Sequence, residues 1–168
     1  MRTALLLALA AYGVSGAAVE PQVAGDPFGQ MKSLAGEWQA ELPGYGQIQD
    51  SIRLVSKGTA LEETLGTPGD DEVSIYTRDG KRVLLTHFCA LTADGHVARL
   101  ETGAQQGSSG ELTFTLASLS NLPDESAPHM RRVVITFVDR DHFRERWSKT
   151  EKGADTVFDL WFARRPVS

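Results

Sequence analysis

Cysteine is almost absent from this chain, which has one thiol, Cys89, among 168 residues. A single cysteine cannot form an internal disulfide, so the fold has to rely on an ordinary hydrophobic core. Basic residues are also few, 17 against 22 acidic residues, which gives a formal net charge of −5. Nucleic acids and anionic membrane surfaces both require a cationic face, so we expect neither as a partner.

Long apolar runs are absent after the opening residues "MRTALLLALAAYGVSGAA". This segment combines Arg2 with an apolar run from Ala4 to Val14 and small residues up to Ala18. The run is too short to span a bilayer, and the pattern is typical of a secretory signal peptide. We therefore predict a signal peptide over residues 1–18, cleaved after Ala18 or after Ala17. The mature protein should be exported to the periplasm or the medium, without insertion into a membrane.

The rest of the chain repeats one pattern of short runs and turns. Residues 19–27 are interpreted as a flexible arm, and "PFGQMKSLAG" predicts a short helical turn. Ten strand-like runs follow, such as "RVLLTHFCAL" and "RRVVITFVD", separated by turns rich in Gly, Asp or Ser. Such a meander usually closes so that no strand edge is left unpaired. We predict an all-β domain over residues 28–166, a single antiparallel up-and-down β-barrel of about ten strands after a short N-terminal helical turn.

Several motifs resemble those of known barrels. The sequence Gly-Glu-Trp at 36–38 resembles the Gly-x-Trp opening of lipocalins and the wider calycin superfamily. That resemblance implies that Trp38 closes one barrel end and that Arg164, or else Arg165, packs across it. The chain also resembles an exported bacterial lipocalin-like family of unassigned function, through "MKSLAGEW", "KGTALEET", "VLLTHFC", "NLPDESAPHM", "ITFVDRDHF" and "RERW". This second resemblance covers residues 28–164 and implies a fold but no chemistry.

The stretch "VLLTHFCAL" contains the residues with the most distinctive chemistry. His87 and Cys89 are two positions apart, so on a strand both side chains project to the same face. One hypothesis makes them soft ligands for copper, zinc or haem iron, with His129 and Met130 added from the long 121–129 loop. A second makes Cys89 a nucleophile with His87 or His129 as its base. A third treats them as a packed thiol and a hydrogen-bonded core histidine.

Two carboxylates occupy positions where the strand pattern expects apolar residues. Glu145 lies between Phe143 and Trp147, and Asp159 lies between Val157 and Trp161. A carboxylate inside a barrel requires a partner, a ligand or a raised pKa, whereas an outward one pairs with a neighbouring arginine. The sequence leaves both orientations open.

The predicted function is the binding of a small, mainly apolar molecule inside the barrel, because a ten-stranded barrel has room for a ligand. No cofactor is required for that function. The two alternatives are a metal or haem protein and an enzyme with its site at the barrel mouth. The residues expected to line the cavity or its mouth are His87, Cys89, His129, Met130, Glu145 and Trp147.

Overall fold

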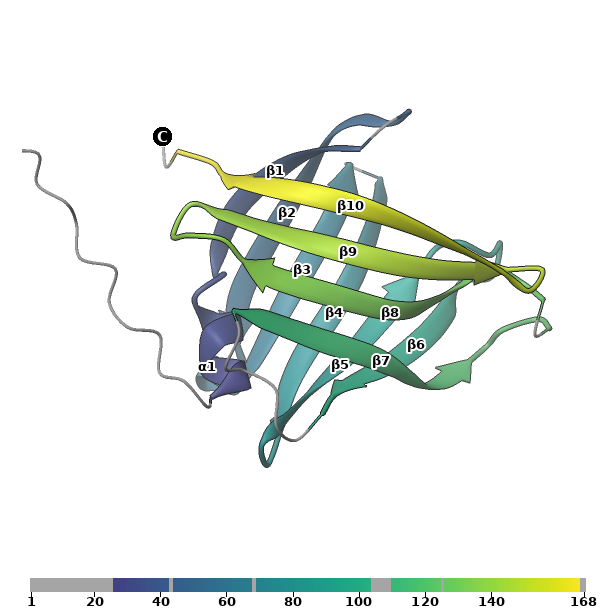
Figure 1. Ribbon diagram of the computed structural model, residues 1–168, viewed down its shortest axis with the longest axis horizontal. Helices are drawn as coiled ribbons and strands as arrows, with labels where there is room; N and C mark the ends of the chain where they lie inside the picture. Colours follow the sequence, from purple (N-terminus) through teal and green to yellow (C-terminus); the bar gives the residue numbers. More distant parts are fainter. Residues whose placement is uncertain (1–25, 43, 68, 104–109, 125, 167–168) are drawn as a thin grey trace, which may run out of the picture.

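Ten antiparallel strands form a closed barrel in the computed structural model of this chain (Figure 1). The structure describes residues 26–166, except residues 43, 68, 104–109 and 125. The strands follow one another around the barrel, and the pairing of β1 with β10 closes it. The predicted up-and-down β-barrel is therefore confirmed. The predicted signal peptide, and residues 19–25 of the predicted arm, lie outside the described residues.

One short helix, α1 (Pro27–Lys32), precedes the strands, and a 3-10 turn, η1 (Ser56–Gly58), joins the second strand to the third. Among the described residues, no helix is long and apolar enough to cross a membrane. The strands are β1 (Gly36–Leu42), β2 (Gly46–Val55), β3 (Ala60–Thr67), β4 (Asp70–Asp79), β5 (Arg82–Cys89), β6 (His96–Thr102), β7 (Glu111–Ser120), β8 (His129–Phe137), β9 (His142–Glu151) and β10 (Ala154–Arg164).

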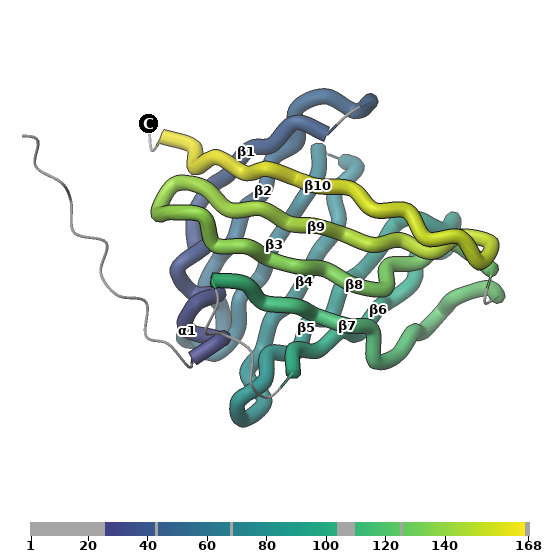
Figure 2. Tube along the Cα trace, viewed as in Figure 1, coloured from purple at the N-terminus to yellow at the C-terminus, as the bar shows by residue number. Residues whose placement is uncertain are grey.

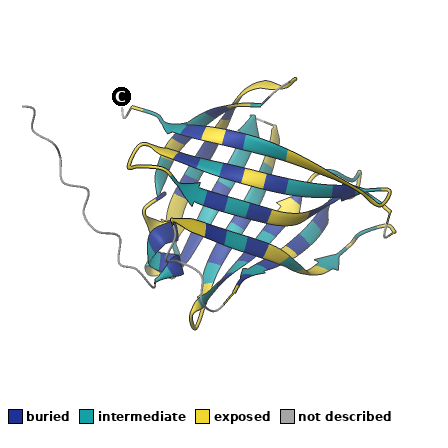
Figure 3. Cartoon of the chain, viewed as in Figure 1, coloured by how far each residue is buried: buried dark blue, intermediate teal, exposed yellow. Residues whose placement is uncertain are grey.

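Burial alternates along the strands, as the period of two requires (Figure 3). On β5, Val83, Leu85, His87 and Cys89 are buried, whereas the residues between them are half-buried or exposed. A similar alternation on most of the strands places about one side chain in two inside the barrel. The inward side chains form a single hydrophobic core, in which the largest fully buried side chains are aromatic.

Helix α1 lies at one end of the barrel, beside the start of β1 (Figure 2). We call this the helix end, and the opposite end, where β5 ends and β6 and β8 begin, the open end. Trp38 is fully buried at the helix end and donates its indole N–H to the Leu34 carbonyl at 2.8 Å. The Arg164 guanidinium lies 3.9 Å from the centre of the Trp38 ring, so Arg164 rather than Arg165 is the arginine that covers it.

The backbone at position 36, two residues before Trp38, requires a glycine. Its φ is +146°, a value that L side chains rarely adopt, and a Cβ atom there would lie 2.3 Å from Arg164 Nη1. The same guanidinium donates to the Ala35 carbonyl at 3.1 Å and to the Arg140 carbonyl at 3.1 Å. The Arg164 guanidinium therefore connects β10 to the segment just before β1 and to the turn between β8 and β9.

Candidate functional site

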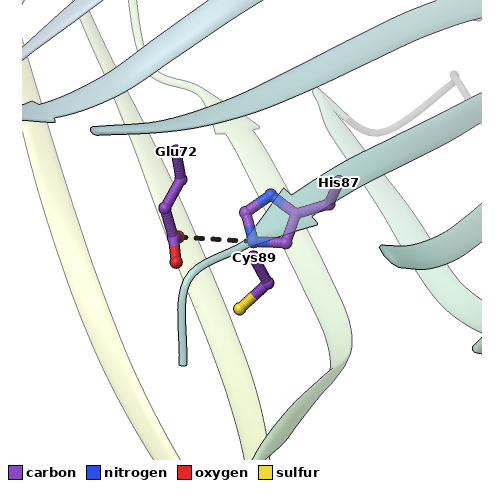
Figure 4. A group of neighbouring side chains, drawn as sticks. All are labelled: Glu72, His87 and Cys89. Carbon is purple, nitrogen blue, oxygen red and sulfur yellow. Dashed lines mark ion pairs between the residues drawn. The ribbon is translucent and has the colours of Figure 1, made fainter. Parts of the chain in front are cut away.

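A carboxylate, an imidazole and a thiol meet at the open end of the barrel (Figure 4). Glu72 comes from β4, and His87 and Cys89 come from the neighbouring strand β5. One ligand atom from each residue lies within 4.8 Å of the other two, and His87 Nε2 is 3.4 Å from Glu72 Oε2. His87 and Cys89 are buried, whereas the Glu72 side chain is 24% exposed. The group therefore sits at the boundary between the core and solvent.

Burial and the neighbouring charged groups keep the thiol protonated and the carboxylate ionised. Burial and the nearby Glu72 carboxylate raise the pKa of the Cys89 thiol to about 12. Burial also raises the pKa of Glu72, but the His87 imidazole and the Ala90 N–H outweigh it, so that pKa lies below its ordinary value. A thiol with so high a pKa forms little thiolate at neutral pH, which argues against Cys89 as a nucleophile.

The His87 ring is oriented from behind by polar residues of the core. Its Nδ1 atom lies 3.1 Å from Ser74 Oγ, and Ser74 also hydrogen bonds the buried Glu63 carboxyl. Tyr76 donates its hydroxyl to Glu63 Oε2 at 2.8 Å. On its other side His87 packs against Trp147, with 5.0 Å between the ring centres. These contacts hold Nε2 toward Glu72, and Nε2 is buried without a hydrogen-bond partner.

Two further histidines surround this group. His96 is paired with Cys89 in the β5–β6 register, and both of its ring nitrogens are buried without a hydrogen-bond partner. Burial, and then the neighbouring His87 and His129 imidazoles, lower the pKa of His96, so its ring stays neutral. His129 lies at the start of β8, where its Nδ1 is 2.9 Å from the Ala127 carbonyl. Three of the four histidines in the chain therefore gather at the open end.

An open pocket of about 550 Å³ borders Cys89 and His96. The loop that joins β5 to β6 forms most of its wall, together with Phe88, Val97 and Asn121. Asn121 has a φ of +60° and donates its amide to the carbonyls of Asp94 and Gly95, at 3.1 and 2.8 Å. This side chain fixes the wall of the pocket against the end of β7.

Deeper in the barrel the polar residues are acidic. Asp50, Glu63 and Glu145 are each at most 1% exposed, so the structure resolves the orientation of Glu145 in favour of the interior. Trp147 donates its indole N–H to Glu145 Oε2 at 2.8 Å. Asp159, by contrast, is directed outward and receives hydrogen bonds from Arg146 at 2.9 and 3.1 Å.

The residues named from the sequence are only partly brought together. His87, Cys89, Glu145 and Trp147 all face the interior, and His87 and Trp147 are in contact. His129 and Met130 are buried at the open end, next to an irregularity in the β8–β9 register, but neither belongs to the compact group around Cys89. A shift in register of this kind allows two consecutive residues to be buried.

Sequence reasoning missed four residues of this region: Glu72, Asp50, His96 and Asn121. Each has a signal that was available. Asp50 shares a strand face with Ile48 and Ile52, and Glu72 shares one with Tyr76. His96 opens a strand directly after a turn, and Asn121 is the only asparagine in the chain.

No protein-family model matches this chain, and a search of curated proteins finds no significantly similar sequence.

Proposed function

We propose that the protein binds a transition metal ion of the zinc type at the open end of the barrel, through Glu72, His87 and Cys89. The observation that carries this proposal is the convergence of three different ligand atoms on a space of a few ångströms. Carboxylate oxygen, imidazole nitrogen and thiolate sulfur are all established zinc ligands. Cys89 would bind as the thiolate, and its thiol proton would be released to solvent as the ion enters. The mixed set also suits other borderline ions, such as cobalt and nickel.

The spacing of the ligand atoms supports an ion of this size. Bonds of about 2.0–2.2 Å to nitrogen and oxygen place two ligand atoms of a tetrahedral site about 3.4 Å apart. His87 Nε2 and Glu72 Oε2 are 3.4 Å apart, the separation that such a site requires. The sulfur lies within 4.8 Å of both, so a movement of about 1 Å brings it to bonding range.

The surroundings of His87 also suit metal binding. A ligand histidine normally donates its second N–H to a polar partner, which fixes the ring and its tautomer. Ser74 and Glu63 offer such a partner to Nδ1 and leave Nε2 free to coordinate. The open pocket beside Cys89 leaves the fourth coordination position to water, to a small ligand or to His96.

The test is calorimetric titration of chelator-treated protein with Zn²⁺, and with Co²⁺ for its visible spectrum. We expect one bound ion per chain, a thiolate-to-cobalt band, and at least about tenfold weaker binding for each of Glu72→Gln, His87→Gln and Cys89→Ser. The matched control is His142→Gln, which removes an exposed histidine that pairs with Asp139 away from the site.

Two results contradict the proposal. Binding that is equally weakened by His142→Gln would place the ion on the surface, and the absence of stoichiometric binding by the wild-type protein would remove the metal function. An absorption spectrum of the protein purified from its own host is a third test, because a Soret band would identify haem in place of a bare ion.

A small apolar ligand is a second candidate, supported by the open pocket. Phe88, which lines it, is 47% exposed and presents an aromatic surface to a ligand in the pocket. The neutral fluorescent probe N-phenyl-1-naphthylamine tests this function. Phe88→Ser should weaken binding, whereas Leu54→Ser, at a leucine of matching 48% exposure on β2, should not. Equal effects of the two substitutions would indicate unspecific adsorption.

A further inference from the structure

Three carboxyl groups lie inside the barrel without a lysine or arginine to neutralise them. Asp50 lies on β2, Glu63 on β3, and Glu145 on β9, in the wall that faces them (Figure 1). In the part of the chain that the structure describes, no lysine or arginine is buried. Burial of an ionised carboxylate without a counter-ion is strongly unfavourable. The described part of the chain therefore provides no lysine or arginine as a counter-ion for these carboxyl groups.

Several acceptor atoms of these carboxyl groups have no partner. Glu63 accepts a hydrogen bond from Tyr76, and Glu145 accepts one from Trp147. Both oxygens of Asp50 and Oε1 of Glu145 are buried without any hydrogen-bond partner. Buried polar atoms are almost always paired in native proteins, so an unpaired set calls for an explanation. A ligand that carries several N–H donors would pair them.

The spacing of the carboxyl groups favours an organic cation over a metal ion. Among the described residues, Asp50, Glu63 and Glu145 do not form a group whose ligand atoms all lie within 4.8 Å of one another. Oxygens that bind a common metal ion are about 3–3.5 Å apart. Acceptors around an ammonium group, each about 2.8 Å from the nitrogen, are about 4.6 Å apart or more. The three residues therefore do not offer the compact set of ligand atoms that a metal ion requires, although the Glu63 and Glu145 carboxyls are close enough to share a hydrogen bond.

The aromatic residues of this region favour the same class of ligand. Tyr76 is fully buried and Trp147 nearly so, and each is fixed by its hydrogen bond to one of the carboxyl groups. The apolar surfaces of such rings accommodate the alkyl part of an amine.

We propose that the barrel interior is a site for the ammonium group of a small organic amine, held by Asp50, Glu63 and Glu145. This site is separate from the metal site proposed above and does not depend on it. An amine that enters uncharged takes the proton of one carboxyl group, so ammonium and carboxylate form together and no net charge moves into the barrel.

The experiment is calorimetric titration of the full mature chain with hexylamine, which is protonated at neutral pH, against 1-hexanol as its neutral isostere. We expect the wild-type protein to bind hexylammonium at least about tenfold more tightly than hexanol, and Asp50→Asn and Glu145→Gln to remove most of that preference. Circular dichroism verifies that each variant is folded.

Two control variants separate this site from others. Glu41→Gln removes an exposed carboxylate of β1, and Cys89→Ser removes a proposed metal ligand. Neither should change the binding of hexylammonium, whereas Asp50→Asn should leave the affinity for Zn²⁺ unchanged. Success of one titration and failure of the other therefore shows which of the two sites exists.

Four results overturn the proposal. Hexanol that binds as tightly as hexylammonium would show an apolar site, and equal losses in Glu41→Gln would show surface attraction. Calcium binding that is abolished by Asp50→Asn would show a metal site in the acidic cluster. No binding of hexylammonium at low-millimolar concentration by the folded protein would remove the amine site altogether.

Discussion

The buried carboxyl groups should make the protein less stable as the pH rises, and Asp50→Asn tests this directly. Burial, and then the neighbouring Glu63 and Glu145 carboxyls, raise the pKa of Asp50 well above its ordinary value. Burial and Glu63 likewise raise the pKa of Glu145 well above its ordinary value. In the unfolded chain both groups ionise with ordinary pKa values near 4. Between the ordinary and the raised pKa, the folded state therefore binds more protons than the unfolded state.

Linkage gives the sign and the size of the effect. Stability falls with rising pH wherever the folded state binds more protons, by about 1.4 kcal/mol per pH unit for each such carboxyl group. Asparagine cannot ionise, so Asp50→Asn should remove one group's share of the slope. The variant should match the wild-type protein most closely at about pH 4 and exceed its stability by a growing margin above that.

Urea unfolding followed by tryptophan fluorescence at one-unit steps from pH 4 to pH 8 measures this slope. Trp38 and Trp147 are both buried, so their emission reports the loss of the core. Glu41→Gln serves as the control for the loss of a surface charge. A pH-independent stability, or an Asp50→Asn variant that is less stable than wild type at pH 7 in the absence of ligand, would refute the reasoning.

Three further outcomes follow from other parts of the structure. Gly36→Ala should destabilise the fold by about 2–4 kcal/mol in urea unfolding, because it combines an unfavourable φ with a clash against Arg164. The loss of stability in the double variant Gly36→Ala/Arg164→Ala should be smaller than the sum of the losses in the two single variants. Asn121→Ala should cost about 1–2 kcal/mol and speed hydrogen exchange in the β5–β6 loop, whose carbonyls it binds; unchanged exchange would contradict this. Cys89 should resist alkylation at pH 7 in the folded protein, as its pKa of about 12 implies, and mass spectrometry that finds rapid modification would overturn that assignment.

The strands were predictable because each carries its own alternation. Leu112 and Phe114 on β7, or Val133 and Ile135 on β8, specify the buried face from local sequence alone. The turns between the strands then leave few ways to arrange ten antiparallel strands, and closure removes the exposed edges.

The candidate site was predictable only where it lies within one strand. His87 and Cys89 share a face because they are two residues apart, which the sequence states directly. Glu72 joins them through the β4–β5 register, in which Ser74 is paired with His87, and no local pattern determines a register. The inward orientation of Glu145 could not be determined either, because its burial depends on residues that reach it from other strands.

The closure of the barrel at β1 and β10 has a consequence for how the chain folds. Their register contains two residue pairs, Trp38 with Arg164 and Gln39 with Ala163, whereas β9 and β10 share ten. The contact of Arg164 with the Ala35 carbonyl spans 129 residues, and closing a loop of that length costs about 4 kcal/mol in chain entropy. Contacts between residues so far apart in the sequence should form last, so a chain that lacks its final strand has an open sheet with two unpaired edges and a tendency to aggregate.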